Sequence, residues 1–74
     1  DRISMKCNPD YAIELRDRYN GIEGAWHFNK KYWNTVYFNR DVNDRLIKEL
    51  IDHSYNEVIK KFTKKLRAEY DNIR

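Results

Sequence analysis

Few residues in this sequence can cross-link, kink or interrupt the chain. Its 74 residues include one cysteine, one proline and two glycines. The single cysteine, Cys7, has no partner for an internal disulfide, and small secreted domains usually contain several cysteines. We therefore expect a reducing, cytoplasmic setting.

Long apolar runs are also missing. The mean hydropathy is -1.04, and no apolar run approaches the roughly 20 residues that a membrane-spanning helix needs. The first residues, Asp1-Arg2-Ile3-Ser4-Met5, do not show an apolar segment behind a basic stretch. These features predict a soluble protein without a membrane partner. We expect the chain to enter directly into structure, and its excision from a longer chain stays open.

Motifs for metal or nucleotide chemistry are absent from the sequence. The two histidines and Cys7 do not show CxxC, HxxxH or HxH spacing, so no metal site is predicted. Gly21 and Gly24 do not form a glycine-rich phosphate loop, so no nucleotide cofactor is predicted. Cys7 lies on the apolar side of an expected strand, which favours a small core residue over a nucleophile paired with His27. We expect no cofactor, no small-molecule substrate and no enzymatic activity.

Aromatic side chains are plentiful instead. The chain has three Phe, two Trp and six Tyr, and each buried ring removes roughly 150–250 Å² from water. A chain this short buries only about 60% of its unfolded surface, so these rings are expected to supply a compact core. We expect one domain that covers residues 1–74.

Positive charge gathers near the C-terminus. Residues 1–53 hold nine basic and nine acidic side chains, whereas residues 54–74 hold six basic and three acidic ones. Five basic residues without an acid stand within one eight-residue stretch: Lys60, Lys61, Lys64, Lys65 and Arg67. Such a run is usually a solvated helix face whose lysine stems cover apolar neighbours. Contact with phosphates is the alternative interpretation.

The first part of the chain reads as a strand followed by a helix. Residues 2–7 alternate between apolar and polar side chains, which predicts a half-buried strand. Asn8 can cap a helix and Pro9 suits the first helical position. Asn20-Gly21 tolerates the left-handed backbone with which helices commonly end, so we expect the helix to stop there.

A hairpin is expected next, with strands near residues 24–28 and 32–38 joined across residues 29–31. Both strands carry aromatic side chains on both faces, and a small sheet with one solvated face would not show this pattern. We expect helices to cover one face and an absent segment, a second subunit or a stacked ligand to cover the other. We favour the second subunit, which predicts a homodimer. The candidate interface residues are Trp26, Phe28, Trp33 and Tyr37.

The remaining residues are apolar at three- and four-residue steps, which is typical of helices. Ser54 and Glu57 match a capping box, and Thr63 is a second plausible cap, so we expect three pieces rather than one helix. These pieces lie near residues 42–52, 54–61 and 63–73. The predicted fold class is α+β, a small three-stranded antiparallel or mixed sheet with helices on one face, in the order β-α-β-β-α-α-α.

Three segments resemble the MmcQ/YjbR-like family. They are Met5-Lys6-Cys7-Asn8-Pro9, the stretch from Trp26-His27-Phe28-Asn29 through Trp33-Asn34-Thr35-Val36, and Ser54-Tyr55-Asn56-Glu57-Val58 followed by Lys64-Lys65-Leu66-Arg67. The segments occur in the family's order and span nearly the whole chain. The resemblance covers the family's C-terminal part, because its members usually have a helix and further strands before the point where this chain begins.

The resemblance implies a "double-wing" fold that has been proposed to bind DNA, with no established reaction. The family's motif falls on Lys6, His27, Asn29, Lys30, Trp33, Ser54 and Tyr55. Tyr32 stands where the family often has His, which weakens any role that needs two imidazoles there.

Three functions remain in competition. We expect a non-enzymatic self-associating or interaction domain with weak nucleic-acid binding, against the alternatives of a double-wing DNA-binding regulatory protein and an enzyme of unknown reaction. The candidate nucleic-acid contacts are Lys30, Lys31, Lys60, Lys61, Lys64, Lys65 and Arg67. The first two lie at the expected hairpin tip, where a basic wing reaches a phosphate backbone.

Overall fold

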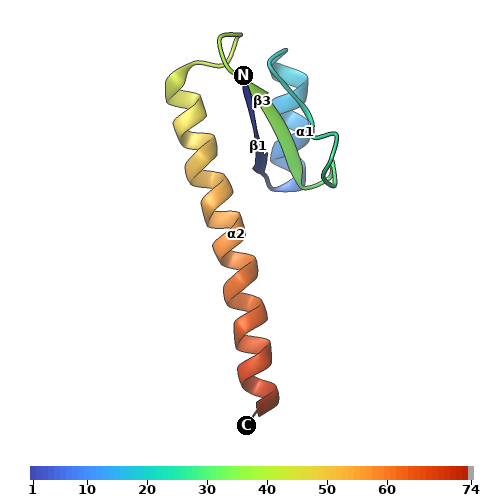
Figure 1. The fold of residues 1–74 in the computed structure, drawn as a ribbon, viewed down its shortest axis with the longest axis vertical. Coiled ribbons are helices and arrows are strands. Elements are labelled where there is room, and N and C mark those ends of the chain that lie inside the picture. Colours follow the sequence, from blue (N-terminus) through green and yellow to red (C-terminus); the bar gives the residue numbers. More distant parts are fainter. Residues whose placement is uncertain (74) are drawn as a thin grey trace.

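The computed structural model describes residues 1–73, which form a small sheet flanked by two helices (Figure 1). The elements in chain order are β1 (Arg2–Lys6), α1 (Pro9–Arg18), β2 (Ile22–Gly24), β3 (Trp33–Tyr37) and α2 (Asp44–Ile73). This arrangement confirms the predicted α+β class and the order of the elements, with the expected C-terminal helices joined into one.

The sheet is antiparallel and has three strands in the order β1-β3-β2. Met5 pairs with Asn34, and Val36 pairs with Ile3 on one side and Ile22 on the other. Directly opposed residues share a face of a sheet. Ile22, Met5 and Val36 therefore lie on one face of this sheet, whose two edges are β1 and β2.

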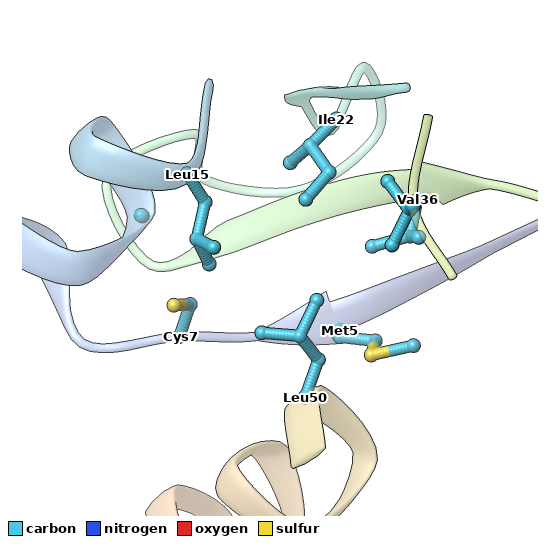
Figure 2. Close-up of a cluster of buried hydrophobic side chains, with 8 residues drawn as sticks. Met5, Cys7, Leu15, Ile22, Val36 and Leu50 are labelled. Atoms are coloured by element: carbon cyan, nitrogen blue, oxygen red, sulfur yellow. The ribbon is translucent and has the colours of Figure 1, made fainter. Parts of the chain in front are cut away.

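The core lies on that face and is covered by both helices (Figure 2). Leu15 of α1 approaches it from the side of β2 and β3, and Leu50 of α2 approaches it from the side of β1. This core cluster consists of the buried side chains of Met5, Cys7, Ala12, Leu15, Ile22, Val36, Val42 and Leu50. The prediction that the helices occupy one face of the sheet is thus confirmed, as is the burial of Cys7. The expectation that aromatic rings supply the core is wrong, because the buried residues are aliphatic or small and Tyr11 and Tyr19 only pack against them.

The start of α1 follows the predicted chemistry, but its end does not. Asn8 Oδ1 accepts hydrogen bonds from the backbone N–H groups of Asp10 (3.0 Å) and Tyr11 (3.4 Å), with proline at the start of the helix. Neither glycine within residues 1–73 has a positive φ, so the expected left-handed stop is wrong. Gly21 is favoured for another reason, because an added Cβ would lie 2.9 Å from Oδ1 of Asp41 and 3.1–3.2 Å from side-chain carbons of Arg40 and Val42.

The predicted division of the C-terminal region into three helices is wrong. α2 is continuous over 30 residues, and its first turn is capped by Asn43, whose Oδ1 accepts from Leu46 N at 2.8 Å. No proline or glycine follows residue 43, so nothing forces an interruption. Ser54 and Thr63 therefore lie within the helix. A capping side chain helps only where a helix already begins.

The predicted hairpin strands are partly wrong. β2 ends at Gly24, and residues 25–32 form a loop instead of continuing a strand to residue 28. The loop closes on Asn29, whose backbone oxygen accepts from both Tyr32 N and Trp33 N at 3.0 Å. Asn29 Oδ1 also accepts from Lys31 N at 3.0 Å. Because the backbone and side-chain oxygens of Asn29 accept from these three N–H groups, the residues form a local turn and not the hydrogen-bond ladder of a strand.

Candidate nucleic-acid interface

An open groove of about 480 Å³ lies between α2 and the start of β3. We call it the lysine groove. Its lining residues come from β1, the start of α1, the turn before β3 and the middle of α2: Lys6, Pro9, Asn29, Tyr32, Trp33, Glu57, Lys60, Lys61 and Lys64. The groove therefore depends on how α2 is attached to the sheet.

That attachment is made along the open edge of β1. Cys7 N–H donates to Tyr32 O at 2.7 Å, and alternate N–H groups of a strand point to opposite sides. The N–H groups of Lys6 and Asn8 consequently point away from β3. Two neighbouring side chains of α2 accept them: Ser54 Oγ binds Lys6 N at 2.9 Å, and His53 Nε2 binds Asn8 N at 3.2 Å.

These two bonds satisfy part of an edge strand and fix the helix beside it. An edge-to-face contact between the rings of Tyr11 and His53, 5.0 Å apart, adds a second attachment to α1. Because α2 is straight and continuous, the next turns beyond Ser54 carry Lys60, Lys61 and Lys64 to the groove.

The opposite wall of the groove is a pre-organised loop. Phe28 stacks on Trp33 with ring centroids 4.8 Å apart, and Arg16 donates to Lys30 O at 2.9 Å. The ammonium groups at the tip lie over aromatic rings, with Lys30 Nζ 5.0 Å from the Trp26 ring. These contacts hold the turn in place without a strand.

The groove combines cationic and aromatic side chains. Lys6, Lys60, Lys61 and Lys64 supply four ammonium groups against one carboxylate, that of Glu57, and Tyr32 and Trp33 supply two rings. Single-stranded nucleic acids are commonly bound by this pairing of backbone-tracking cations and base-stacking rings. Lysine suits phosphate as a point charge, whereas base readout favours the planar groups of Arg, Asn or Gln. A set of side chains of this kind can bind phosphate.

The structure brings together only some of the predicted site residues. Lys6, Asn29 and Trp33 from the family motif meet Lys60, Lys61 and Lys64 from the basic run in the groove. Lys65 and Arg67 are exposed and do not line it. Lys31 lies over the ring of Tyr32, 5.6 Å from its centroid. Sequence reasoning did not identify Pro9 as a neighbour of the basic run, because the two are far apart in the sequence. It also missed Glu57, which it assigned to a capping box although Lys60 and Lys61 follow at helical spacing.

The remaining motif and interface residues lie elsewhere. His27 lines a second depression of about 310 Å³, on the sheet face that the helices leave open, with Arg2, Ser4, Trp26, Phe28, Thr35 and Tyr37. Tyr55 is exposed on α2, and Ser54 is engaged by Lys6. The candidate interface at Trp26, Phe28, Trp33 and Tyr37 is not tested and stays a prediction. Trp26 is 73% exposed.

Glu23 organises the second depression. Its Oε1 accepts from Tyr37 Oη at 2.6 Å and from Trp26 Nε1 at 3.1 Å. These hydrogen bonds, that from Tyr37 first, lower the pKa of Glu23, and the same contact raises the pKa of Tyr37. Arg40 lies over the Tyr37 ring, 4.2 Å from its centroid. The Glu23 carboxylate thus already accepts from the Tyr37 hydroxyl and the Trp26 indole N–H.

The chain offers little for covalent or metal chemistry. Burial raises the pKa of the Cys7 thiol to about 11, which leaves it protonated near neutral pH, and the thiolate is the reactive form. Cys7 lies in the core and His27 in the depression on the other face of the sheet. Among residues 1–73 there is no group of three or more His, Cys, Asp or Glu that could hold a metal ion. No helix within that range is long and apolar enough to cross a membrane.

A model of the YjbR family matches residues 1–57. Uncharacterized protein YjbR of Escherichia coli K12 is 33% identical over 57 residues, which are 77% of this chain and 48% of that protein. Uncharacterized protein YbdF of Escherichia coli O157:H7 is 32% identical over 57 residues, 77% of this chain and 47% of the relative. The chain thus spans about half the length of the curated relatives it matches.

Solved structures of a protein from Pseudomonas syringae are similar. The crystal structure has a TM-score of 0.68 and 37% identity, over 73% of this chain and 45% of that one. The solution NMR structure has a TM-score of 0.65 and 36% identity, over 76% of this chain and 44% of that one. The family match ends within α2, so Lys60, Lys61 and Lys64 lie beyond it.

Proposed function

The chain belongs to the YjbR family, and from that premise we propose that it is a non-enzymatic interaction domain whose lysine groove binds the phosphate backbone of single-stranded nucleic acid. The observation that carries the proposal is the meeting of Lys6 with Lys60, Lys61 and Lys64 beside two aromatic rings. The relatives' names assign no activity, so the argument rests on the groove.

Single strands fit the groove better than a duplex does. Tyr32 and Trp33 stand next to the lysines, and the stacking of a base on such a ring requires an unpaired base. The groove-lining residues include no arginine, and contacts made by lysine carry little sequence information. Binding is therefore expected to be poor in sequence preference.

Affinity should be weak and sensitive to salt. The net charge of the chain is only +3, and Glu57 opposes phosphate within the groove. Each phosphate contact on a single strand contributes about −0.7 to the slope of log affinity against log salt, so four contacts give a slope of about −3. A much steeper slope would require contacts outside the groove.

The test is a titration of labelled single-stranded and duplex oligonucleotides at low and physiological salt. A groove variant carries Lys60→Gln, Lys61→Gln and Lys64→Gln. A matched control carries Lys48→Gln, Lys65→Gln and Arg67→Gln, which removes the same charge from α2 outside the groove. The groove variant should lose on the order of tenfold in affinity and flatten the salt slope by about 2. If both variants lost the same affinity, binding would depend on net charge alone, and the groove would not be the binding site.

A duplex-binding regulatory protein is the alternative. It draws on the basic tip at Lys30 and Lys31, the position of a wing, whose ammonium groups lie over the rings of Trp26 and Tyr32. Duplex binding that exceeds single-strand binding and is lost on Lys30→Gln with Lys31→Gln would favour this alternative over the groove.

The absence of enzymatic activity is part of the proposal. It is supported by the protonated, buried state of Cys7 and by the separation of Cys7 from His27 across the sheet. Nucleophilic catalysis needs a nucleophile and a base within hydrogen-bond reach.

A further inference from the structure

A continuous line of apolar side chains follows α2 on the side away from the sheet. Its members are Ile51, Tyr55, Val58, Ile59, Phe62, Leu66 and Tyr70, each between 42% and 66% exposed. We call this line the α2 stripe. Figure 1 shows that the C-terminal half of α2 extends well beyond the rest of the molecule. Contiguous exposed apolar surface of this kind usually marks an interaction site.

The stripe is distinct from the face by which α2 packs on the sheet. Leu50 is buried in the core, whereas Phe62 is 61% exposed. Twelve positions separate them, which at about 100° per residue places their side chains about 120° apart around the helix. Lys60 and Lys64 fall on a third side, so the stripe leaves the lysine groove free.

The projecting part of α2 has little to support it within one copy. Residues 58–73 lie beyond the family match, and those of them up to residue 72 are exposed. Helices in proteins are stabilised mainly by packing of an apolar face, and the apolar face of this part is exposed. The stripe is therefore expected to have an occupant.

The charges along α2 favour a second copy of the same helix. Residues 44–58 contain four acidic and two basic side chains, whereas residues 59–73 contain five basic and two acidic ones. Two antiparallel copies bring the acidic half of each helix alongside the basic half of the other, although Lys60, Lys61 and Lys64 lie on other sides of α2 than the stripe and make no pairs across it. Parallel copies place like charges together, which is unfavourable.

The spacing of the stripe fits that arrangement. Tyr55, Ile59, Phe62 and Leu66 follow each other at steps of four, three and four residues, the spacing of a coiled-coil seam. In an antiparallel pair, Tyr55 of each copy meets Leu66 of the other, and Ile59 meets Phe62. If each stripe side chain exposes on the order of 100 Å², two copies bury about 1,400 Å², which is the size of a stable interface.

We propose that α2 mediates homodimerisation, with the α2 stripes of two copies packed antiparallel. This places the contact on the helix and not on the aromatic sheet face predicted from the sequence. Packing of the two stripes then stabilises the C-terminal part of α2, so its helix should fray less and helix content should rise with protein concentration.

The test is sedimentation equilibrium of the full chain, with circular dichroism over the same concentrations. Phe62→Glu should weaken association on the order of 100-fold, because each dimer loses two buried rings. Ala68→Glu places the same charge on another side of α2 and should leave association nearly unchanged. A parent chain that stays monomeric at hundreds of micromolar, or equal losses in both variants, would overturn the proposal. So would a monomer that binds anionic lipid vesicles through the stripe, because the occupant would then be a membrane surface.

Cross-linking tests the orientation. Asn56 and Thr63 flank the stripe, and the antiparallel register places Asn56 of one copy beside Thr63 of the other. A chain with Asn56→Cys and Thr63→Cys should form a covalent dimer on mild oxidation, with buried Cys7 unreactive. The single variants should each cross-link far less. A non-covalent dimer that forms no disulfide in the double variant would overturn the antiparallel arrangement.

Discussion

The two ends of α2 show how one helical pattern serves two environments. In the N-terminal part, Leu50 is 4% exposed and packs on the sheet, whereas in the C-terminal part Phe62 is 61% exposed. Both parts have the same apolar period, and hydropathy alone does not distinguish them. What separates them is the sheet, which stands beside the first part only. An amphipathic pattern therefore specifies a helix but not the surface that covers it.

The largest effect is expected where the helix meets the core. Leu50→Ala leaves a cavity among Met5, Val36 and neighbouring side chains and should lower the free energy of unfolding by about 2–5 kcal/mol. Phe62→Ala, measured at a concentration where the chain is monomeric, should change it by less than about 0.5 kcal/mol. Urea titrations of both variants check this contrast. Similar losses would show that the projecting part has an intramolecular partner.

A smaller effect is expected at the junction of the two parts. Ser54→Ala removes the acceptor of Lys6 N–H and should cost about 1–2 kcal/mol. Thr63→Ala is the matched change in the exposed part and should be neutral or slightly stabilising, because alanine is the better helix former. Glu57→Ala separates the two explanations of Ser54: a capping box needs a Glu or Gln side chain at residue 57, whereas the bond to Lys6 does not. A marked loss with Glu57→Ala would contradict the continuous helix.

The smallest effect depends on pH and concerns the turn before β2. Asp41 accepts hydrogen bonds from Asn20 N and Gly21 N, both at 2.7 Å. These bonds, that from Asn20 first, lower the pKa of Asp41 below its ordinary value of 3.8. A carboxyl whose pKa is lowered by folding contributes stability above its unfolded pKa and loses it as the pH falls through the folded value.

Asp41→Asn should therefore lower the thermal midpoint at pH 7, and the difference from the parent should fade as the pH drops below about 4. Asp71→Asn, in the exposed part of α2, is the control and should leave the midpoint unchanged at both pH values. A difference between Asp41→Asn and the parent that is the same at pH 7 and pH 3 would assign the effect to packing rather than charge.

Local chemistry predicted several features well. The alternation of residues 2–7 matches β1, and Asn8 with Pro9 marks the start of α1. The helical period from Leu46 onward matches α2. Each of these signals acts over a few residues, so the sequence contains all the partners involved. The family motif likewise led to the YjbR family, which the comparisons confirm.

The errors have two different causes. Ser54 looked like a helix cap because its sequence neighbours supply a capping box, yet its hydroxyl accepts from Lys6 N, 48 positions away. A short window of sequence does not contain that donor. The residues near Trp26 looked like a strand, yet the backbone and side-chain oxygens of Asn29 accept from N–H groups two to four residues further on. Here the competing partners are local, and the strand pattern of the aromatic side chains outweighed the turn signal.

The sequence by itself therefore determined the class of the fold, its order of elements, the basic character of residues 60–67 and the family. Tertiary structure decided that α2 lies along the open edge of β1, that Lys6 and Trp33 meet Lys60, Lys61 and Lys64 in one groove, and that the α2 stripe faces away from the core. The physical reason is the unpaired edge of β1. Its outward N–H groups require acceptors. Because His53 and Ser54 of α2 supply them, the rotation of α2 about its axis is fixed, and with it the directions in which the groove lysines and the α2 stripe face.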